Sequence, residues 1–230
     1  MSLGKTLASI TIVWFGLSLS LSSAPALASP SKTIGILVFD GFLTSDVTAP
    51  VEVFGAATKK SWFSSYSVVV ISTTHNKVVH SEEGLALVAE KTIYDDDLKL
   101  DVLLVPSSYH MDTVVKDPNV IAFIRKQRQS ASWVGSNCSG ALLLGEAGVL
   151  DGKKATTWAG GEKGLAKSYP KVDVQFDQNV VVDGNVITSN GGPVSYQAAF
   201  ELLARLSSED FAKEIRRTIQ FDRLKTAFAP

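Results

Sequence analysis

The strongest fold signal in this chain of 230 residues is the stretch Ser132-Trp-Val-Gly-Ser-Asn-Cys138-Ser-Gly-Ala-Leu-Leu-Leu-Gly-Glu-Ala-Gly-Val149. The segment begins with a β-like run to Ser136 and continues with a helix-like run from Ala141. Cys138, the only cysteine, therefore occupies a strand-to-helix turn beside the first free N–H groups of a helix. We expect these groups to lower the thiol pKa and Gly140 to leave room for a substrate, which makes Cys138 a candidate nucleophile. The alternative is a buried cysteine that only fills space.

The rest of the chain alternates β-branched apolar runs with helical periodicity. Strands are predicted at 33–39, 67–72 and 101–105, helices at 46–59, 112–129, 194–206 and 209–221, and hairpins over 77–89 and 180–188. Nearly continuous apolar strands separated by helices indicate a parallel sheet that is covered on both faces. The predicted fold class is α/β, a three-layer α/β/α sandwich with a mostly parallel, flavodoxin-like central sheet.

The N-terminal segment has the features of a signal peptide. Lys5 precedes the apolar run 7–21, and Ala26-Leu-Ala28 has the small-x-small pattern of a cleavage site. We expect residues 1–28 to be a signal peptide, residues 29–230 to form a single domain, and the protein to be exported, periplasmic or secreted. An uncleaved membrane anchor is the alternative. Loss of Lys5 changes the formal net charge from −1 to −2 with both signs interspersed, so neither nucleic acid nor a stable membrane partner is expected.

In an open parallel sheet, ligands bind beyond the carboxyl ends of the strands. Four predicted loops reach that edge: 40–46, 106–112, the Cys138 turn and 156–160. Asp46 is the candidate acid, able to share a proton with the thiol or to act as a general base, although it could simply cap the first helix. Glu52 is the competing acid. His110 is a candidate to orient or deprotonate Cys138.

Further candidates line the same predicted edge. Backbone N–H groups of Ser107 to Tyr109 and of Ser139 could form an oxyanion hole, and Trp158 is a candidate for the pocket wall. The histidines are scattered through the sequence without a short-spaced ligand pair, and no phosphate-binding glycine motif follows the first predicted strand. We therefore expect no metal and no cofactor.

Three groups of residues resemble the ThiJ/PfpI family of the class I glutamine-amidotransferase-like superfamily. The first group is residues 34–42 and 46–54, the second is residues 138–152 and 155–157, and the third is residues 183–189 and 191–193. The resemblance as a whole covers about residues 33–206. It implies that Cys138 is the nucleophile of a sharp turn, that Asp46 hydrogen-bonds it, and that Ser139 donates its N–H to an oxyanion. Trp158 stands where many members have histidine, and Ser107 and Ser108 follow Pro106 where many have two glycines. A complete protease triad is therefore not expected.

The resemblance implies a cysteine-dependent hydrolase or hydro-lyase that acts on a small electrophilic molecule. Family members that hydrate isonitriles use an acid, a cysteine and its hydroxyl-bearing neighbour, roles that Asp46, Cys138 and Ser139 would fit. One alternative is glyoxalase or deglycase activity on methylglyoxal adducts, for which His110 would supply the histidine. Another is a noncatalytic ligand-binding, stress or redox-sensing protein in which Cys138 oxidises. The resemblance also implies a homodimer.

Overall fold

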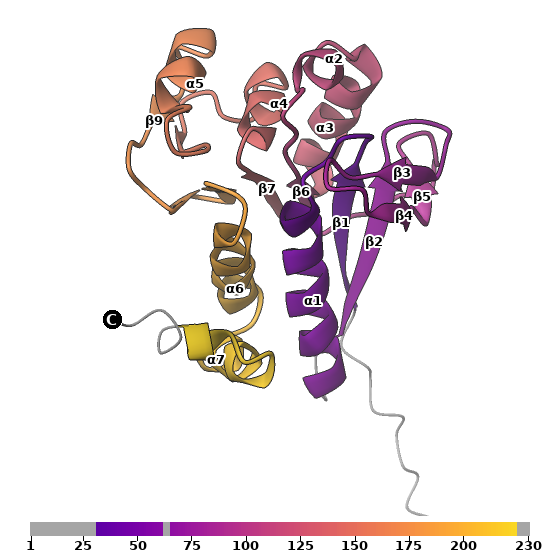
Figure 1. Cartoon of the computed structure of the whole chain (residues 1–230), viewed down its shortest axis with the longest axis vertical. Coiled ribbons are helices and arrows are strands. Elements are labelled where there is room, and N and C mark those ends of the chain that lie inside the picture. Colours follow the sequence, from indigo (N-terminus) through magenta and orange to yellow (C-terminus); the bar gives the residue numbers. More distant parts are fainter. Residues whose placement is uncertain (1–30, 62–64, 225–230) are drawn as a thin grey trace, which may run out of the picture.

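A seven-stranded, mostly parallel sheet forms the centre of the fold (Figure 1). The computed structural model describes residues 31–61 and 65–224, so the predicted signal peptide lies outside the described residues. In spatial order the strands are β10 (Val180–Asp183), β11 (Val186–Ser189), β7 (Trp133–Asn137), β6 (Val102–Val105), β1 (Lys32–Val38), β2 (Tyr66–Ser72) and β5 (Lys91–Thr92). Neighbouring strands are parallel except β10 and β11.

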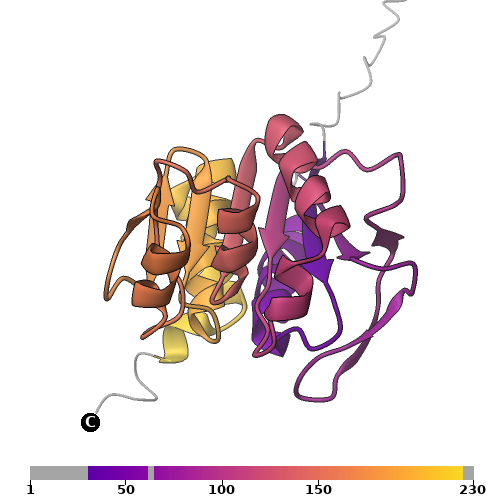
Figure 2. The same cartoon turned by 90° about the horizontal axis from the view of Figure 1, so that it is seen from above.

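Helices cover both faces of the sheet (Figure 2). One layer contains α1 (Thr44–Lys60), α6 (Val194–Leu206) and α7 (Glu209–Thr218), and the other contains α2 (Asp112–Val115), α3 (Pro118–Ser130) and α4 (Gly140–Glu146). The remaining elements are β3 (Val78–His80), β4 (Ala86–Val88), β8 (Lys154–Ala155), α5 (Glu162–Ser168), β9 (Asp173–Val174) and η1 (Phe221–Arg223). The predicted α/β/α sandwich is confirmed. Within the described part of the chain, no helix combines the length and apolarity needed to span a membrane.

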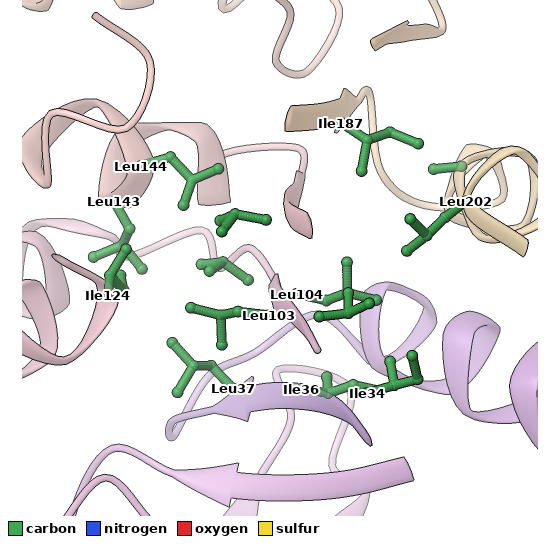
Figure 3. Close-up of a cluster of buried hydrophobic side chains, with 14 of the residues drawn as sticks. Ile34, Ile36, Leu37, Leu103, Leu104, Ile124, Leu143, Leu144, Ile187 and Leu202 are labelled. Carbon is green, nitrogen blue, oxygen red and sulfur yellow. The ribbon is translucent and has the colours of Figure 1, made fainter. Parts of the chain in front are cut away.

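The core lies on both sides of the sheet because alternate strand residues point to opposite faces. On β1, Ile34 and Ile36 point to one side and Leu37 to the other, and all three are fully buried (Figure 3). On β6, Leu103 and Leu104 alternate in the same way. Leu37 and Leu103 lie on the same side as Ile124, Leu143 and Leu144 of α3 and α4 (Figure 3). Burial on both faces explains why these strands are continuous apolar runs.

The two predicted hairpins are confirmed. β10 and β11 pair in antiparallel register up to Asp183 and Val186, around a two-residue turn formed by Gly184 and Asn185. Gly184, the first of the two turn residues, has a positive φ of 60°, which glycine adopts without strain. The smaller hairpin joins β3 and β4. It places Ser81 and Glu82 beside the loop that follows β1, because Glu82 N–H donates to the Phe42 carbonyl.

The prediction of a single helix over 112–129 is wrong. The chain forms α2, breaks, and starts α3 at Pro118. Proline has no N–H to continue a preceding helix and holds Asp117 in an extended conformation, with φ −76° and ψ 110°. The Asp117 carboxylate then caps α3 by accepting from Asn119 N–H at 2.8 Å. The last predicted helix is also too long, since α7 ends at Thr218 and Gln220 has φ 62°.

Candidate active site

Cys138 lies between β7 and α4 with a φ of 50°, in the left-handed region that non-glycine residues rarely adopt. Its N–H donates to the Ser189 carbonyl at 2.8 Å, and its own carbonyl accepts from Thr157 Oγ1 at 2.8 Å. These contacts come from β11 and from the segment after β8, so two distant parts of the chain hold the strained residue. The predicted strand-to-helix turn is confirmed.

Glycine is required on two sides of this turn. A Cβ on Gly140 would lie 2.5 Å from the Val105 carbonyl oxygen and 2.7 Å from that of Pro106. A Cβ on Gly191, whose φ is 79°, would lie 2.4 Å from Cys138 Cβ and 3.0 Å from Asp46 Oδ1. Gly140 therefore lets α4 approach the end of β6. The space beside Gly140 is filled by backbone atoms, so the expectation that it leaves room for a substrate is wrong. Gly191 lets the cysteine and the acid lie close together.

Asp46 is buried in the first turn of α1, with 1% of its surface exposed. Its Oδ1 accepts from Gly192 N–H at 2.9 Å and Ser195 Oγ at 2.7 Å. Its Oδ2 accepts from both the N–H and the hydroxyl of Ser107. The helix cap position belongs to Leu43, so Asp46 does not cap α1. The competing acid, Glu52, is exposed and accepts from the Tyr196 hydroxyl.

The main chain of Asp46 is also tied to the cysteine turn. Pro50, inside α1, has no N–H to donate to the Asp46 carbonyl four residues earlier. Asn137 Nδ2 donates to that carbonyl instead, at 3.1 Å. Asn137 Oδ1 in turn accepts from Ser189 Oγ at 2.6 Å. The residue that precedes Cys138 therefore links α1, which carries the acid, to β11.

The pKa values of the Asp46 carboxyl and of the Cys138 thiol are both raised. Burial raises the pKa of the Asp46 carboxyl, and the hydrogen bonds from Ser107, Ser195 and Gly192 offset part of that rise. Burial and the Asp46 charge raise the pKa of the Cys138 thiol, while hydrogen bonds from Ser107 and Ser139 act in the opposite direction with smaller effect. The prediction that the turn lowers the thiol pKa is therefore wrong, because burial and the neighbouring carboxylate outweigh the N–H groups.

The predicted oxyanion donors have different surroundings. Ser107 N–H is occupied by Asp46 Oδ2 at 3.1 Å. Ser108 N–H points to Ser139 Oγ at 3.3 Å, and Ser139 Oγ donates to the Ser108 carbonyl at 2.8 Å. The Ser139 N–H lowers the pKa of the Cys138 thiol, although burial and the Asp46 charge have the larger effect. Among the N–H groups of Ser107, Ser108 and Ser139, that of Ser139 is therefore the one that acts on the reacting atom.

A pocket of about 600 Å³ opens above Cys138. Its walls include Ser108, His110, Ser139 and Trp158, so the structure brings these predicted site residues together. Trp158 is half-buried, and its ring packs so closely on Gly161 that a Cβ there would lie 2.2 Å from a ring carbon. His110 is exposed at the rim, and its N–H donates to Ser108 Oγ at 2.9 Å. Across residues 31–61 and 65–224, His, Cys, Asp and Glu form no cluster of three or more suited to a metal ion.

Several site residues were not predicted from the sequence. Thr157, Gly191 and Ser195 contact Cys138 or Asp46 but are distant from both in sequence. A signal was present for Asn137, since a proline four residues after Asp46 leaves a helical carbonyl that needs a donor from elsewhere. No local pattern marks Ser195, which reaches Asp46 only because α6 packs beside α1.

Comparisons with known proteins agree with this geometry. A model of the DJ-1/PfpI family matches residues 32–205. An isonitrile hydratase from Pseudomonas putida is 31% identical over 189 residues, which are 82% of this chain and 78% of the relative. Protein/nucleic acid deglycase 2 from Escherichia coli is 28% identical over 166 residues, 71% of this chain and 90% of the relative. A crystal structure of a ThiJ/PfpI family protein from Pseudomonas syringae superposes with a TM-score of 0.75 and 24% identity, covering 91% of this chain and 82% of that one. The chain therefore belongs to the DJ-1/PfpI family.

Proposed function

We propose that this protein is a cysteine-dependent hydratase that converts an isonitrile into an N-substituted formamide. The observation that carries the proposal is the juxtaposition of Cys138 with Asp46, since a Cβ on Gly191 would lie 2.4 Å from Cys138 Cβ and 3.0 Å from Asp46 Oδ1. Both Asp46 oxygens accept hydrogen bonds, as those of a carboxylate do, and burial raises the pKa of this carboxyl, which makes it a stronger base. A pocket open to small molecules lies directly above the thiol. The similarity to the isonitrile hydratase of Pseudomonas putida supports the same reaction class.

Isonitrile chemistry matches a site that combines a nucleophile with a group that accepts and returns a proton. The terminal carbon of an isonitrile accepts a nucleophile and then requires a proton on that same carbon. The Cys138 sulfur forms a bond to the carbon, and the carbon–nitrogen triple bond becomes a double bond. The proton lost by the thiol finishes on the carbon, and Asp46 holds it between the two positions. The product of this step is a thioimidate on Cys138.

Water completes the reaction. Its oxygen adds to the thioimidate carbon, and Asp46 takes one proton from the water and passes it to the nitrogen. As the adduct collapses, the carbonyl forms and the carbon–sulfur bond breaks, and the remaining hydroxyl proton passes through Asp46 to the sulfur and restores the thiol. Ser139 N–H, which lowers the pKa of the thiol, is placed to stabilise negative charge during bond formation and cleavage. The net change is addition of one water to the isonitrile.

The pocket lining favours an uncharged substrate. Met111, Leu142 and Trp158 give it apolar surface, and among the described residues none that lines it is lysine or arginine. An anionic substrate would therefore lack a cationic partner in this pocket. An isonitrile with a small apolar substituent fits this site, because the substituent matches the apolar lining and the isonitrile carbon matches the Cys138 nucleophile.

The two alternatives are less well supported by the site. A redox sensor needs a thiolate, because susceptibility to oxidation follows thiolate character, and the raised pKa of Cys138 works against it. Similarity to the deglycase supports activity on methylglyoxal adducts. However, Trp158 lines the pocket beside Cys138, and the exposed His110 lies at its rim. No hydrogen bond joins the His110 ring to Cys138 in the described part of the chain.

Product analysis separates hydration from the methylglyoxal alternative. Residues 29–230 are incubated with an alkyl isonitrile and, separately, with methylglyoxal, and products are followed by proton NMR. We expect the formyl proton of an N-alkyl formamide from the first reaction and no lactate from the second. Lactate without formamide would contradict the proposal and favour the glyoxalase alternative. Cys138→Ser serves as the control for background hydrolysis in both reactions.

Export is part of the proposal because the N-terminal sequence predicts a signal peptide. The full chain is expressed in a bacterial host, cell fractions are separated, and the N-terminus of the recovered protein is sequenced. We expect an N-terminus at Ser29 in the periplasmic or secreted fraction. An intact N-terminus in the cytoplasm would contradict export. The predicted homodimer is tested on the same sample by light scattering.

A further inference from the structure

We propose that the indole ring of Trp158 is the binding surface for an aromatic substituent of the substrate, which makes Trp158 the specificity-determining residue of this pocket. The inference rests on the proposed function, because Cys138 fixes where the reactive carbon of the substrate lies. Trp158 and Cys138 line the same pocket of about 600 Å³. A molecule bonded to the sulfur therefore extends its substituent into space that Trp158 borders.

The main chain holds Trp158 at a fixed place relative to the nucleophile. The hydroxyl of the preceding residue, Thr157, donates to the Cys138 carbonyl at 2.8 Å. The Thr157 carbonyl accepts from Asn190 Nδ2, just after the end of β11. Residue 157 is thus tied both to the cysteine turn and to the segment after β11, so the position of residue 158 relative to the sulfur is set in advance.

The ring of Trp158 is fixed by packing. A Cβ on Gly161 would lie 2.2, 2.3 and 2.5 Å from the ring carbons Cε2, Cδ2 and Cζ2. The first two of these carbons are shared by the two fused rings, so they are approached only from a face of the indole. Gly161 therefore covers one face, and its N–H donates to the Trp158 carbonyl at 2.9 Å. A ring that is already fixed loses little conformational freedom when a ligand packs on it.

The lining of the pocket matches an aromatic group. Tyr109 and His110 add two more rings to that of Trp158, and Met111 and Leu142 add apolar surface. Tyr109 is 74% exposed, so its ring is largely uncovered. An aromatic substituent gains from offset or edge-to-face contact with such rings and from contact with the thioether, in addition to the burial of its apolar surface. A saturated ring of the same size gains from burial alone, so we expect arylalkyl isonitriles to be preferred over cycloalkyl ones.

The first test is alkylation of Cys138, which needs no turnover. Rates are measured with two iodoacetamide derivatives, one N-benzyl and one N-cyclohexylmethyl, and each is corrected for its rate with a free thiol. Both reagents meet the same fraction of thiolate, so the ratio of the two rates is independent of the thiol pKa. We expect the wild type to prefer the benzyl reagent by about 3- to 10-fold. A ratio of one would overturn the aromatic preference.

Three variants test whether the preference belongs to Trp158. Trp158→Leu should abolish it, whereas Trp158→Phe keeps a ring and should retain part of it. Trp133→Leu is the matched control, because Trp133 is also half-buried but lies at the opposite end of β7 from Cys138, and its ratio should equal that of the wild type. Unsubstituted iodoacetamide checks that the cysteine turn is intact in each variant. Full preference in Trp158→Leu would overturn the inference.

The second test is steady-state hydration of benzyl isonitrile and methyl isonitrile. We expect Trp158→Leu to raise KM for benzyl isonitrile by about 10-fold with kcat changed far less, because the lost contact is made before and during the reaction. KM for methyl isonitrile should change far less, since a methyl group is too small to pack on the ring.

The two tests separate this inference from the proposed function. If benzyl isonitrile is hydrated and Trp158→Leu has the kinetics of the wild type, the role of Trp158 is wrong while hydration by Cys138 stands. If the alkylation ratio depends on Trp158 as expected but neither isonitrile yields a formamide, the binding surface stands and the proposed reaction is wrong.

Discussion

The side-chain amide of Asn137 donates a hydrogen bond to the main-chain carbonyl of Asp46, with an N–O distance of 3.1 Å. This contact exists because Pro50 cannot supply the helical N–H that would otherwise use the carbonyl. Asn137 is adjacent to Cys138 in sequence, so one hydrogen bond joins the turn of the nucleophile to the helix of the acid. The relative position of the two groups is thereby set by main-chain and side-chain contacts together.

Asn137→Ala should therefore destabilise the protein. It leaves the buried Asp46 carbonyl and the Ser189 hydroxyl without their present partner, at a cost of about 1–3 kcal/mol for each unsatisfied group. The free energy of unfolding is measured in urea. A change within error of zero would contradict the role given to this amide.

Pro50→Ala should partly rescue Asn137→Ala. The substitution introduces an N–H one helical turn after Asp46, where it can donate to the same carbonyl. A double-mutant cycle measures the coupling, and we expect the double variant to be less destabilised than the sum of the single variants. Strict additivity would show that Pro50 and Asn137 do not share the carbonyl.

Gly191→Ala should be far more damaging than Gly148→Ala. Both glycines have positive φ, 79° and 72°, so each substitution carries a backbone strain of about 1–2 kcal/mol. A Cβ on Gly148 meets nothing within 4 Å, whereas one on Gly191 would lie 2.4 Å from Cys138 Cβ. We expect Gly191→Ala to show the larger loss in urea unfolding and to abolish Cys138 reactivity. Equal losses with intact reactivity would mean that the turn can move aside.

Asp46→Asn should shift the alkylation profile of Cys138 to lower pH. The raised thiol pKa places the wild-type profile above the ordinary cysteine value of about 8.5, and removal of the carboxylate charge lowers that pKa. Glu52→Gln, on the exposed side of α1, is the matched control and should leave the profile in place. A profile that stays fixed in Asp46→Asn would show that the two groups do not interact.

The same substitution should reduce both hydration and stability. The reaction loses its general acid and base, so we expect the rate of hydration to fall by about 100-fold or more. The new amide would place an NH₂ group against the N–H of either Ser107 or Gly192, which costs about 1–3 kcal/mol for the unsatisfied contact. Activity and urea unfolding are measured on the same preparation. Full activity would contradict the role of Asp46.

The sheet and its turns could be predicted from the sequence because their signals are local. The apolar run before Asp40, the Asp183-Gly184 turn and the strand-to-helix change around Cys138 each lie within a few residues. The break between α2 and α3 also had a local signal, Pro118, which outweighs the apolar periodicity around it. The assembly of four loops at one sheet edge followed from the strand order of a parallel sheet.

The chemical state of the site could not be predicted in the same way. The thiol pKa depends on how deeply Cys138 is buried and on the distance to Asp46, and neither is a property of the local turn. Ser195 and Gly191 enter the site through packing of α6 and the loop before it. The sequence marked Ser107 as a candidate oxyanion donor and as a departure from glycine, whereas its two hydrogen bonds to Asp46 became visible in three dimensions.

The most direct test of cysteine-dependent hydration is a side-by-side rate measurement on wild type and Cys138→Ser. An alkyl isonitrile is added at equal protein concentration, and formamide is followed by proton NMR. Serine keeps the shape of the turn but is a far weaker nucleophile, so we expect formamide from the wild type and a rate at least about 1,000-fold lower from the variant. Formamide formed by the variant at the wild-type rate would show that Cys138 is not the nucleophile, and none formed by the wild type would show that isonitriles are not its substrates.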